Sequence, residues 1–355
     1  METKKTQNKA FENLIESMPS VTAIVGMAKN SGKTVVLNHL LKRLNQSGVN
    51  LGVTSIGRDG EAEDTLTLTE KPAITLYQNQ YFATGQKLLF QSDLEYKILR
   101  ETEIETYFGK VIIGVALSTG EIQLSGGNTN EDHLKIIHHL KSFGCEKILL
   151  DGAMDRQAVI SPKIVDGFIL ATGAVLNPKM EKVIELTKAR IQQFSLEQVD
   201  ERLKALCEIE FAKSADAVNS VGIYNEGEHA IKWLEALQTA LESSQEIARK
   251  LTENDRTVIL KGSLTQRLLD QLERISPHFK SLTFVIEDGT KIFMEAEKMR
   301  RFEKMGIQFK VLYPQKLLAI TLNPTSPTGE NFEAEEFLNR ARAAFEPLIV
   351  IDVCI

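Results

Sequence analysis

The feature that most constrains the fold of this chain is one stretch near its start, VTAIVGMAKNSGKTVVLNHLL, which covers residues 21–41. Its first five residues are apolar or β-branched, as in a buried strand, and the run ends at Gly26. After a polar loop, apolar residues recur at helical spacing, at Val36, Leu37, Leu40, Leu41 and Leu44, and Gly48 offers a left-handed helix stop. The stretch predicts a strand, a glycine-bearing loop and an amphipathic helix.

A loop of this kind can hold a phosphate group. Backbone N–H groups at a helix N-terminus and a glycine that permits close approach both favour an anion. Lys33 would place a positive charge at the β- and γ-phosphates, and the Thr34 hydroxyl would bind Mg²⁺. The predicted phosphate-binding residues are Gly26, Lys29, Asn30, Ser31, Gly32, Lys33 and Thr34. The alternative is a glycine turn with an incidental lysine.

Short apolar runs alternate with helical stretches along the whole chain, which predicts an α/β fold with a parallel sheet. At about 150 residues per domain, the 355 residues suggest two domains. We expect a nucleotide-binding domain at residues 1–199 and a smaller α/β domain, which would bind a partner, at residues 200–355. The expected strands are residues 21–25, 51–56, 111–117, 147–150 and 167–171 in the first domain, and 257–260, 282–286, 309–312, 317–322 and 348–353 in the second.

The spacing within the loop carries a family resemblance. Five residues separate Gly26 from Gly32, one more than in the commonest phosphate loop. This pattern resembles dethiobiotin synthetase and related SIMIBI-class P-loop NTPases, and the resemblance covers about residues 20–171. It implies two further carboxylates at the Mg²⁺ site, which correspond to Asp64 in EDTLTL and Asp151 in KILLDGA.

Metal chemistry is compatible with both acids, because Mg²⁺ prefers hard oxygen ligands and strand ends face the ligand crevice of α/β proteins. For Asp151 the alternative is a tight Asp-Gly turn. For Asp64 it is a solvated acid at a helix start, and Asp59 competes for the same role. Lys29 is a further candidate phosphate contact, in its own loop or in that of a second subunit of a homodimer.

Resemblance to the synthetase implies an ATP-dependent ligase, but two features of that family are missing. Where the synthetase has a substrate-binding Lys-Pro, this chain has TSIGR at residues 54–58. Its acid-Gly-Ala-Gly-Gly stretch is here DGAMD, at residues 151–155. The phosphate machinery is therefore expected without an evident ligase substrate site.

A second similarity runs along the chain, in GMAKNSGKT, IGRDGE, LLDGAMDR, DGFILATGAVL and ITLNPTSPTG. These strings resemble the reactivase accessory proteins of adenosylcobalamin-dependent lysine 5,6-aminomutase in lysine fermentation. That family implies ATP-driven release of damaged cobalamin with a MutS-like ATPase partner. If the loop acts as a nucleotide-dependent switch, we expect slow hydrolysis that rises with the partner. ATP is the default nucleotide because no Asn-Lys-x-Asp guanine signature occurs. A third hypothesis is a nucleotide-binding adaptor without substantial catalysis.

Charge, hydropathy and cysteine content limit the kinds of partner and the location that we expect for this protein. The net charge of −6 gives no concentrated basic charge for nucleic acid. No apolar run approaches the roughly 20 residues needed to cross a bilayer, and the first residues lack a signal-peptide core. Three well-separated cysteines indicate neither a zinc knuckle nor a disulfide framework. We therefore expect a cytoplasmic protein that binds neither membrane nor nucleic acid.

Overall fold

A computed structural model describes residues 2–56, 73–153, 160–213, 220–234, 240–252 and 255–352. The chain divides into two units. Unit 1 comprises Met1–Lys188 together with Lys316–Ile355, and unit 2 comprises Ala189–Gln315. This corrects the expected division at residues 199 and 200, because the last two strands of the chain pair with the first sheet and not with the second.

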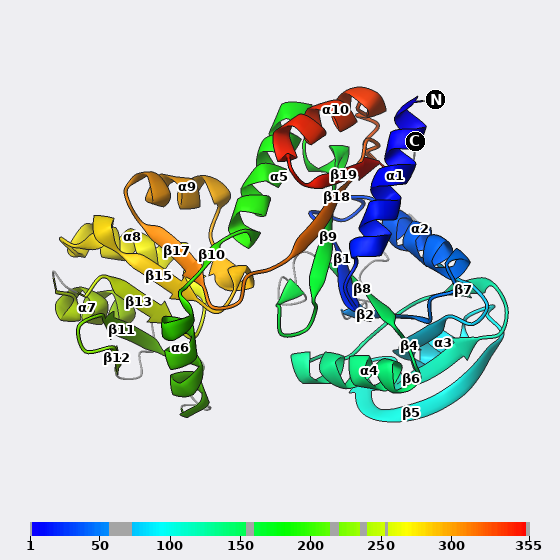
Figure 1. The fold of residues 1–355 in the computed structure, drawn as a ribbon, viewed down its shortest axis with the longest axis horizontal. Helices are drawn as coiled ribbons and strands as arrows, with labels where there is room; N and C mark the ends of the chain where they lie inside the picture. Colours follow the sequence, from blue (N-terminus) through cyan, green and yellow to red (C-terminus); the bar gives the residue numbers. More distant parts are fainter. Residues whose placement is uncertain are drawn as a thin grey trace. The chain divides into compact units, whose positions relative to one another are not determined.

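Unit 1 is built on a nine-stranded sheet (Figure 1). From β19 to β4 all neighbours are parallel, whereas β6 and β5 add an antiparallel edge. The α/β prediction is confirmed, but the strand expected at residues 111–117 corresponds to β6, which ends at Ala116 and lies in this antiparallel edge. In spatial order the strands are β19 (Ile349–Asp352), β18 (Leu317–Asn323), β9 (Gly167–Gly173), β1 (Val21–Gly26), β8 (Lys147–Ala153), β2 (Leu51–Ile56), β4 (Tyr81–Gly85), β6 (Gly109–Ala116) and β5 (Tyr96–Thr106).

Helices α1 (Glu2–Ser17) and α2 (Lys33–Gln46) cover one face of this sheet (Figure 1). The apolar residues predicted for α2 are all buried, and they pack with Phe11 and Leu14 of α1 against Ile24 of β1. Burying one leucine side chain is worth about 1.5–3 kcal/mol, so this stripe fixes the direction in which α2 leaves the loop.

Helices α4 (Asn130–Ser142) and α5 (Met180–Phe194) lie on the other face. A side chain at Gly52 of β2 would point toward Leu140 of α4. Its neighbours Leu51 and Val53 point to the opposite face and belong to the core under α2. Thr172 of β9 shares a hydrogen bond of 2.8 Å with Thr187 of α5. Arg340 of α10 (Ala334–Phe345) pairs with Glu181 of α5. Helices therefore cover both faces, as in doubly wound α/β sheets.

The strand order places β1 at the point where the chain reverses direction across the sheet. From β1 the chain crosses through α2 to β2 on one side, and β9, β18 and β19 extend the sheet on the other. In open α/β sheets, ligands bind outside the carboxyl ends of the strands at such a point. The carboxyl ends of β1, β8, β9 and β18 are therefore the first place to look for a site.

The smaller elements of unit 1 lie between these strands in the sequence. Strands β3 and β7 form an antiparallel pair. The remaining elements are β3 (Ile74–Leu76), α3 (Gln86–Phe90), β7 (Gly120–Ile122) and the 3-10 helix η3 (Ala174–Leu176).

Unit 2 has a six-stranded sheet of its own, parallel from β10 to β13 and antiparallel at β11 and β12. The predicted strand at residues 257–260 is confirmed at its bounds. The strands are β10 (Glu197–Gln198), β17 (Gln308–Val311), β15 (Thr283–Ile286), β13 (Thr257–Leu260), β11 (Val221–Asn225) and β12 (Ala230–Trp233). The helices are α6 (Glu201–Lys213), α7 (Ala240–Lys250), α8 (Gln266–Ile275) and α9 (Ala296–Lys304), with η4 (Phe279–Ser281), η5 (Gly289–Lys291) and the short pair β14 (Leu264–Thr265) and β16 (Ile292–Phe293).

Within the part of the chain that the structure describes, no helix combines the length and the apolar character that a membrane span requires.

Candidate functional site

The strand, loop and helix predicted from residues 21–41 are present in unit 1. β1 ends at Gly26, α2 begins at Lys33, and Gly48 adopts the left-handed conformation predicted for the helix stop, with φ 74°. The loop between them continues the sheet for one more bond, because Met27 N donates to Ala171 O at 2.8 Å. It then turns through two left-handed residues, Asn30 with φ 63° and Gly32 with φ 92°.

The N-terminus of α2 is open to an anion. Gly32 is the N-cap, none of the described side chains caps the helix, and no acidic residue stands in its first turn. The first N–H groups of a helix lack partners within the helix and carry partial positive charge. An anion at this position would find these N–H groups, with Lys33 and Thr34 beside them.

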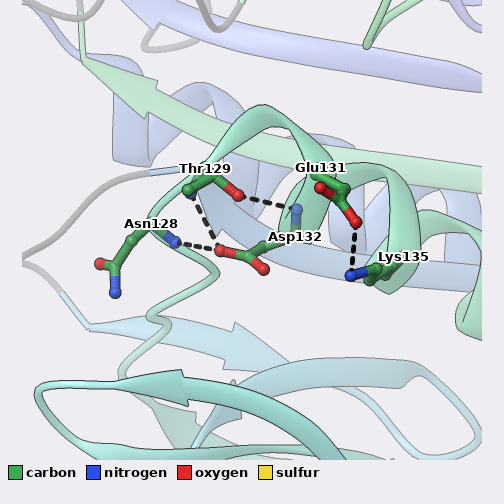
Figure 2. A network of polar contacts seen from close by, with 5 residues as sticks. All are labelled: Asn128, Thr129, Glu131, Asp132 and Lys135. Atoms are coloured by element: carbon green, nitrogen blue, oxygen red, sulfur yellow. Dashed lines mark hydrogen bonds and ion pairs between the residues drawn. The ribbon is translucent and has the colours of Figure 1, made fainter.

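The N-terminus of α4 shows the opposite arrangement (Figure 2). The Thr129 hydroxyl accepts from Asp132 N at 3.1 Å, and the Asp132 carboxylate accepts from the N–H groups of Asn128 and Thr129. This capping box already places a negative charge on the helix end. Of these two helix starts in unit 1, α2 is the one suited to an external anion.

Lys33 and Asp151 meet at the carboxyl edge of the sheet. Lys33 Nζ lies 3.2 Å from Asp151 Oδ1, and the two side chains are 25% and 13% exposed. Asp151 lies inside β8, opposite Ile24 of β1 and Ser55 of β2. The alternative of an Asp-Gly turn at Asp151 is therefore wrong. Two residues predicted for one site from separate motifs are brought together by the pairing of β1 with β8.

Ser31 occupies the interior of the loop. Its side chain is 1% exposed, and its Oγ is buried with no hydrogen-bond partner among the described residues. The hydroxyl lies directly over Gly26, where a Cβ would overlap it, and the same Cβ would lie 3.1 Å from Ala28 O. Gly26 is therefore required for the loop to fold back on itself. An unpaired buried hydroxyl costs about 1–3 kcal/mol, so Ser31 is a polar group in need of a partner.

Asn323 joins the site from the far end of the sequence. It is the last residue of β18, and its Nδ2 donates to Asn30 O at 3.0 Å. The prolines at residues 324 and 327 indicate only an exposed loop after this strand. No local pattern reveals the contact, because it depends on β18 pairing with β9, beside the loop at residues 27–32.

The other predicted residues are placed as follows. Thr34 is half-buried in the first turn of α2, and Lys29 is exposed on the loop. Asp64 and Asp59, with residues 57–72, and residues 154–159 lie outside the described residues. Among those that are described, no three His, Cys, Asp or Glu side chains gather as a metal site.

Comparison with known proteins identifies no relative of this chain. A scan of protein-family models, a search of curated proteins and a search of solved structures each find no match.

The residues at this edge of the sheet offer oxygen ligands for a cation and hydrogen-bond donors for an anion. The Asp151 carboxylate and the Thr34 hydroxyl are hard oxygen donors of the kind that Mg²⁺ selects. The buried Ser31 hydroxyl and the uncapped first turn of α2 supply donors for an anion. These residues therefore fit both Mg²⁺ and a triphosphate.

Proposed function

We propose that this chain binds Mg-ATP through residues 26–34 and hydrolyses it slowly, as an accessory or reactivating factor of an adenosylcobalamin-dependent lysine 5,6-aminomutase. The observation that carries the nucleotide part is the uncapped N-terminus of α2, with Lys33 beside Asp151. The aminomutase part rests on the sequence strings that resemble the reactivase proteins, among them GMAKNSGKT and LLDGAMDR.

Each residue has a defined task in this proposal. The N–H groups that open α2 bind phosphate oxygens, and Lys33 neutralises charge on them. Thr34 and Asp151 would hold Mg²⁺, which when bound supplies charge neutralisation on the β- and γ-phosphates. Asp64, or Asp59, is the proposed further acidic ligand. Lys29, which is exposed, would contact phosphate in its own loop or in that of a second subunit.

The ion pair between Lys33 and Asp151 gives the site two arrangements. In one, the lysine is bound to the aspartate; in the other, it is bound to phosphate and the aspartate is available to a cation. Because both side chains are largely removed from water, the attraction between the two charges is offset by the cost of their desolvation, and we expect the net contribution of the pair to be small. Lys33 can therefore leave Asp151 and bind a phosphate at little cost in free energy.

A change of partner for Lys33, from Asp151 to phosphate, is compatible with a nucleotide-dependent switch. Nucleotide-dependent switches hold two segments through the γ-phosphate and its metal and release them on hydrolysis. Here the two segments would be those at residues 58–64 and 151–156, and the partners would be the aminomutase and a MutS-like ATPase subunit. The expected activity is slow alone and faster with the partner.

The test uses the full-length protein. We expect Mg-ATP to bind, Lys33→Ala to abolish binding, and the hydrolysis rate to rise when purified lysine 5,6-aminomutase carrying damaged cobalamin is added. The control is Lys42→Ala, an exposed lysine further along α2. No binding of any nucleoside triphosphate by the wild type would refute the proposal. Rapid turnover of a small acid would instead identify a dethiobiotin synthetase-type ligase, and binding without hydrolysis under all conditions would identify an adaptor.

A further inference from the structure

We propose that Asn323 is a positioning residue for the phosphate loop, one that fixes the direction of the N–H groups at the start of α2. This inference rests on the proposed nucleotide site and adds to it a residue from the C-terminal part of the chain. Its basis is the hydrogen bond from Asn323 Nδ2 to Asn30 O, 3.0 Å long. Asn30 is in the left-handed region, with φ 63°, where non-glycine residues are uncommon and asparagine is among the most frequent of them.

Two glycines make room for the Asn323 side chain. A Cβ at Gly32 would lie 3.0 Å from Asn323 Cβ, and a Cβ at Gly173 would lie 2.8 Å from the same atom. Gly32 belongs to the loop and Gly173 ends β9, so the side chain sits between two elements that each lack a side chain at the point of contact. Asn323 is thus fitted closely against the turn that precedes Lys33.

The orientation of the Asn323 amide follows from its other partners. Thr325 N can only donate, and it lies 3.1 Å from Asn323 Oδ1. The Thr325 hydroxyl donates to the same oxygen at 2.7 Å. The oxygen of the amide is therefore occupied on the Thr325 side, so the NH₂ group must face Asn30 O. Only a side chain with an acceptor on one side and a donor on the other satisfies this position.

Thr325 is itself held by the loop that follows β18. Ser326 N donates to Asn331 Oδ1 at 2.9 Å, and Phe332 N donates to Pro324 O at 2.8 Å. The Phe332 ring packs edge-on against Phe337 of α10, with centroids 5.1 Å apart. The phosphate loop is thereby braced, through Asn323 and this loop, by a helix of the same unit.

The experiment measures hydrogen exchange of backbone amides 27–36 in full-length protein without nucleotide. In Asn323→Asp at pH 8, a carboxylate would face Asn30 O with no proton to donate. We expect exchange at Ser31, Gly32 and Lys33 to become about fivefold faster, the factor for one net hydrogen bond. Thr325→Val, an exposed position that keeps the backbone donor, should give an intermediate increase. Glu330→Gln, at an exposed position of the same loop, should have no effect.

Exchange rates measured at two pH values distinguish a positioning role of Asn323 from a general loss of structure in its variants. The carboxyl group introduced by Asn323→Asp regains a donor when it is protonated, whereas Asn323→Ala never has one. As the pH falls from 8 to 3, below the ordinary Asp pKa of about 3.9, the exchange rates of Asn323→Asp should approach the wild-type values at the same pH, while those of Asn323→Ala should stay about fivefold faster. If Asn323→Asp exchanges like the wild type at pH 8, or if both variants respond alike to pH, the positioning role is wrong.

Nucleotide affinity provides the second arm. We expect the Kd for a fluorescent Mg-ATP analogue to rise about fivefold in Asn323→Ala, which removes the donor without adding charge, and to remain unchanged in Glu330→Gln. Failure of the wild type to bind the analogue would refute the proposed function, but the exchange rates would still decide whether Asn323 orders the loop. Normal binding with unchanged exchange would refute only the role of Asn323.

Discussion

Lys33 Nζ and Asp151 Oδ1 lie 3.2 Å apart, so the first residue of α2 is tied to the middle of β8 across the carboxyl edge of the sheet. The two residues approach because β8 is the parallel neighbour of β1 and its register places Asp151 beside Ile24, shortly before the loop. A phosphate and a cation would each compete for one member of this pair. Ligand binding and the breaking of the ion pair are therefore linked.

The first prediction concerns Asp151→Asn. Without its carboxylate partner, Lys33 is free to meet a phosphate, so the affinity for ATP in EDTA should increase by up to about fivefold, the worth of a partly exposed ion pair. The increase in affinity that Mg²⁺ gives the wild type should shrink, because one hard oxygen ligand is lost. Isothermal titration with and without Mg²⁺ measures both effects. If Asn at this position leaves both affinities at wild-type values, Asp151 is not at the nucleotide site.

The second prediction concerns Lys33→Ala. Mg-ATP at about 100 times its Kd should stabilise the wild type against urea by about 2.7 kcal/mol, because only the folded state binds. The variant should lose most of this gain, and without ligand it should be less stable than the wild type by about 1–3 kcal/mol, because the Asp151 carboxylate, 13% exposed, loses its cationic partner. Lys42→Ala should keep the whole gain. A wild type whose unfolding midpoint does not respond to Mg-ATP would contradict nucleotide binding itself.

The third prediction concerns Gly26→Ala. The added Cβ would overlap the Ser31 hydroxyl and approach Ala28 O, so the loop must shift. We expect a loss of stability of about 1–3 kcal/mol, typical of overpacking, together with loss of Mg-ATP binding. Urea unfolding and fluorescence titration measure the two effects. Adding Ser31→Gly to this variant removes the clashing atom and should restore part of the stability; no recovery would mean that the strain lies elsewhere.

The fourth prediction concerns Ser31→Ala, which removes the buried hydroxyl that has no partner among the described residues. The protein without ligand should become more stable, by about 1 kcal/mol, since an unsatisfied polar group leaves the interior. Phosphate affinity should fall if this hydroxyl serves the anion. Higher stability without ligand together with lower phosphate affinity would show that the Ser31 hydroxyl serves the ligand and not the packing of the loop. Lower stability without ligand would show that the hydroxyl is satisfied.

Local patterns were sufficient for the parts of the site that neighbouring residues determine. The β-branched run at residues 21–25, the helical spacing of α2 and the left-handed Gly48 are confirmed because each depends on residues within a few positions. Asp151 comes directly after a recognisable apolar run, at residues 148–150. Its contact with Lys33 additionally required β8 to be the neighbour of β1, which strand alternation favours but does not specify.

The pairing of strands that are far apart in the sequence could not be predicted from local patterns. The runs at residues 317–322 and 348–353 have the pattern of strands, yet nothing in them says which sheet they join, and the sequence-based division places them in the wrong domain. The contact between Asn323 and Asn30 was missed for the same reason. Residues 111–117 were expected in a parallel sheet because a buried apolar run has the same pattern in either direction.

The last prediction concerns His133 of α4. Burial lowers the pKa of this imidazole from 6.5 to about 4, although Asp132 acts in the opposite direction. Between these values the unfolded chain binds a proton that the folded chain excludes, so this residue favours folding fully above pH 6.5, and its contribution is lost as the pH falls toward 4. The total change is about 3 kcal/mol, which corresponds to the fall in the pKa from 6.5 to about 4. Urea unfolding from pH 7 to pH 4 should show a shallower decline for His133→Leu than for the wild type, whereas His138→Gln, at an exposed position on the same helix, should follow the wild type. Equal declines in all three proteins would mean that His133 titrates normally in the folded state and that other groups cause the loss of stability in acid.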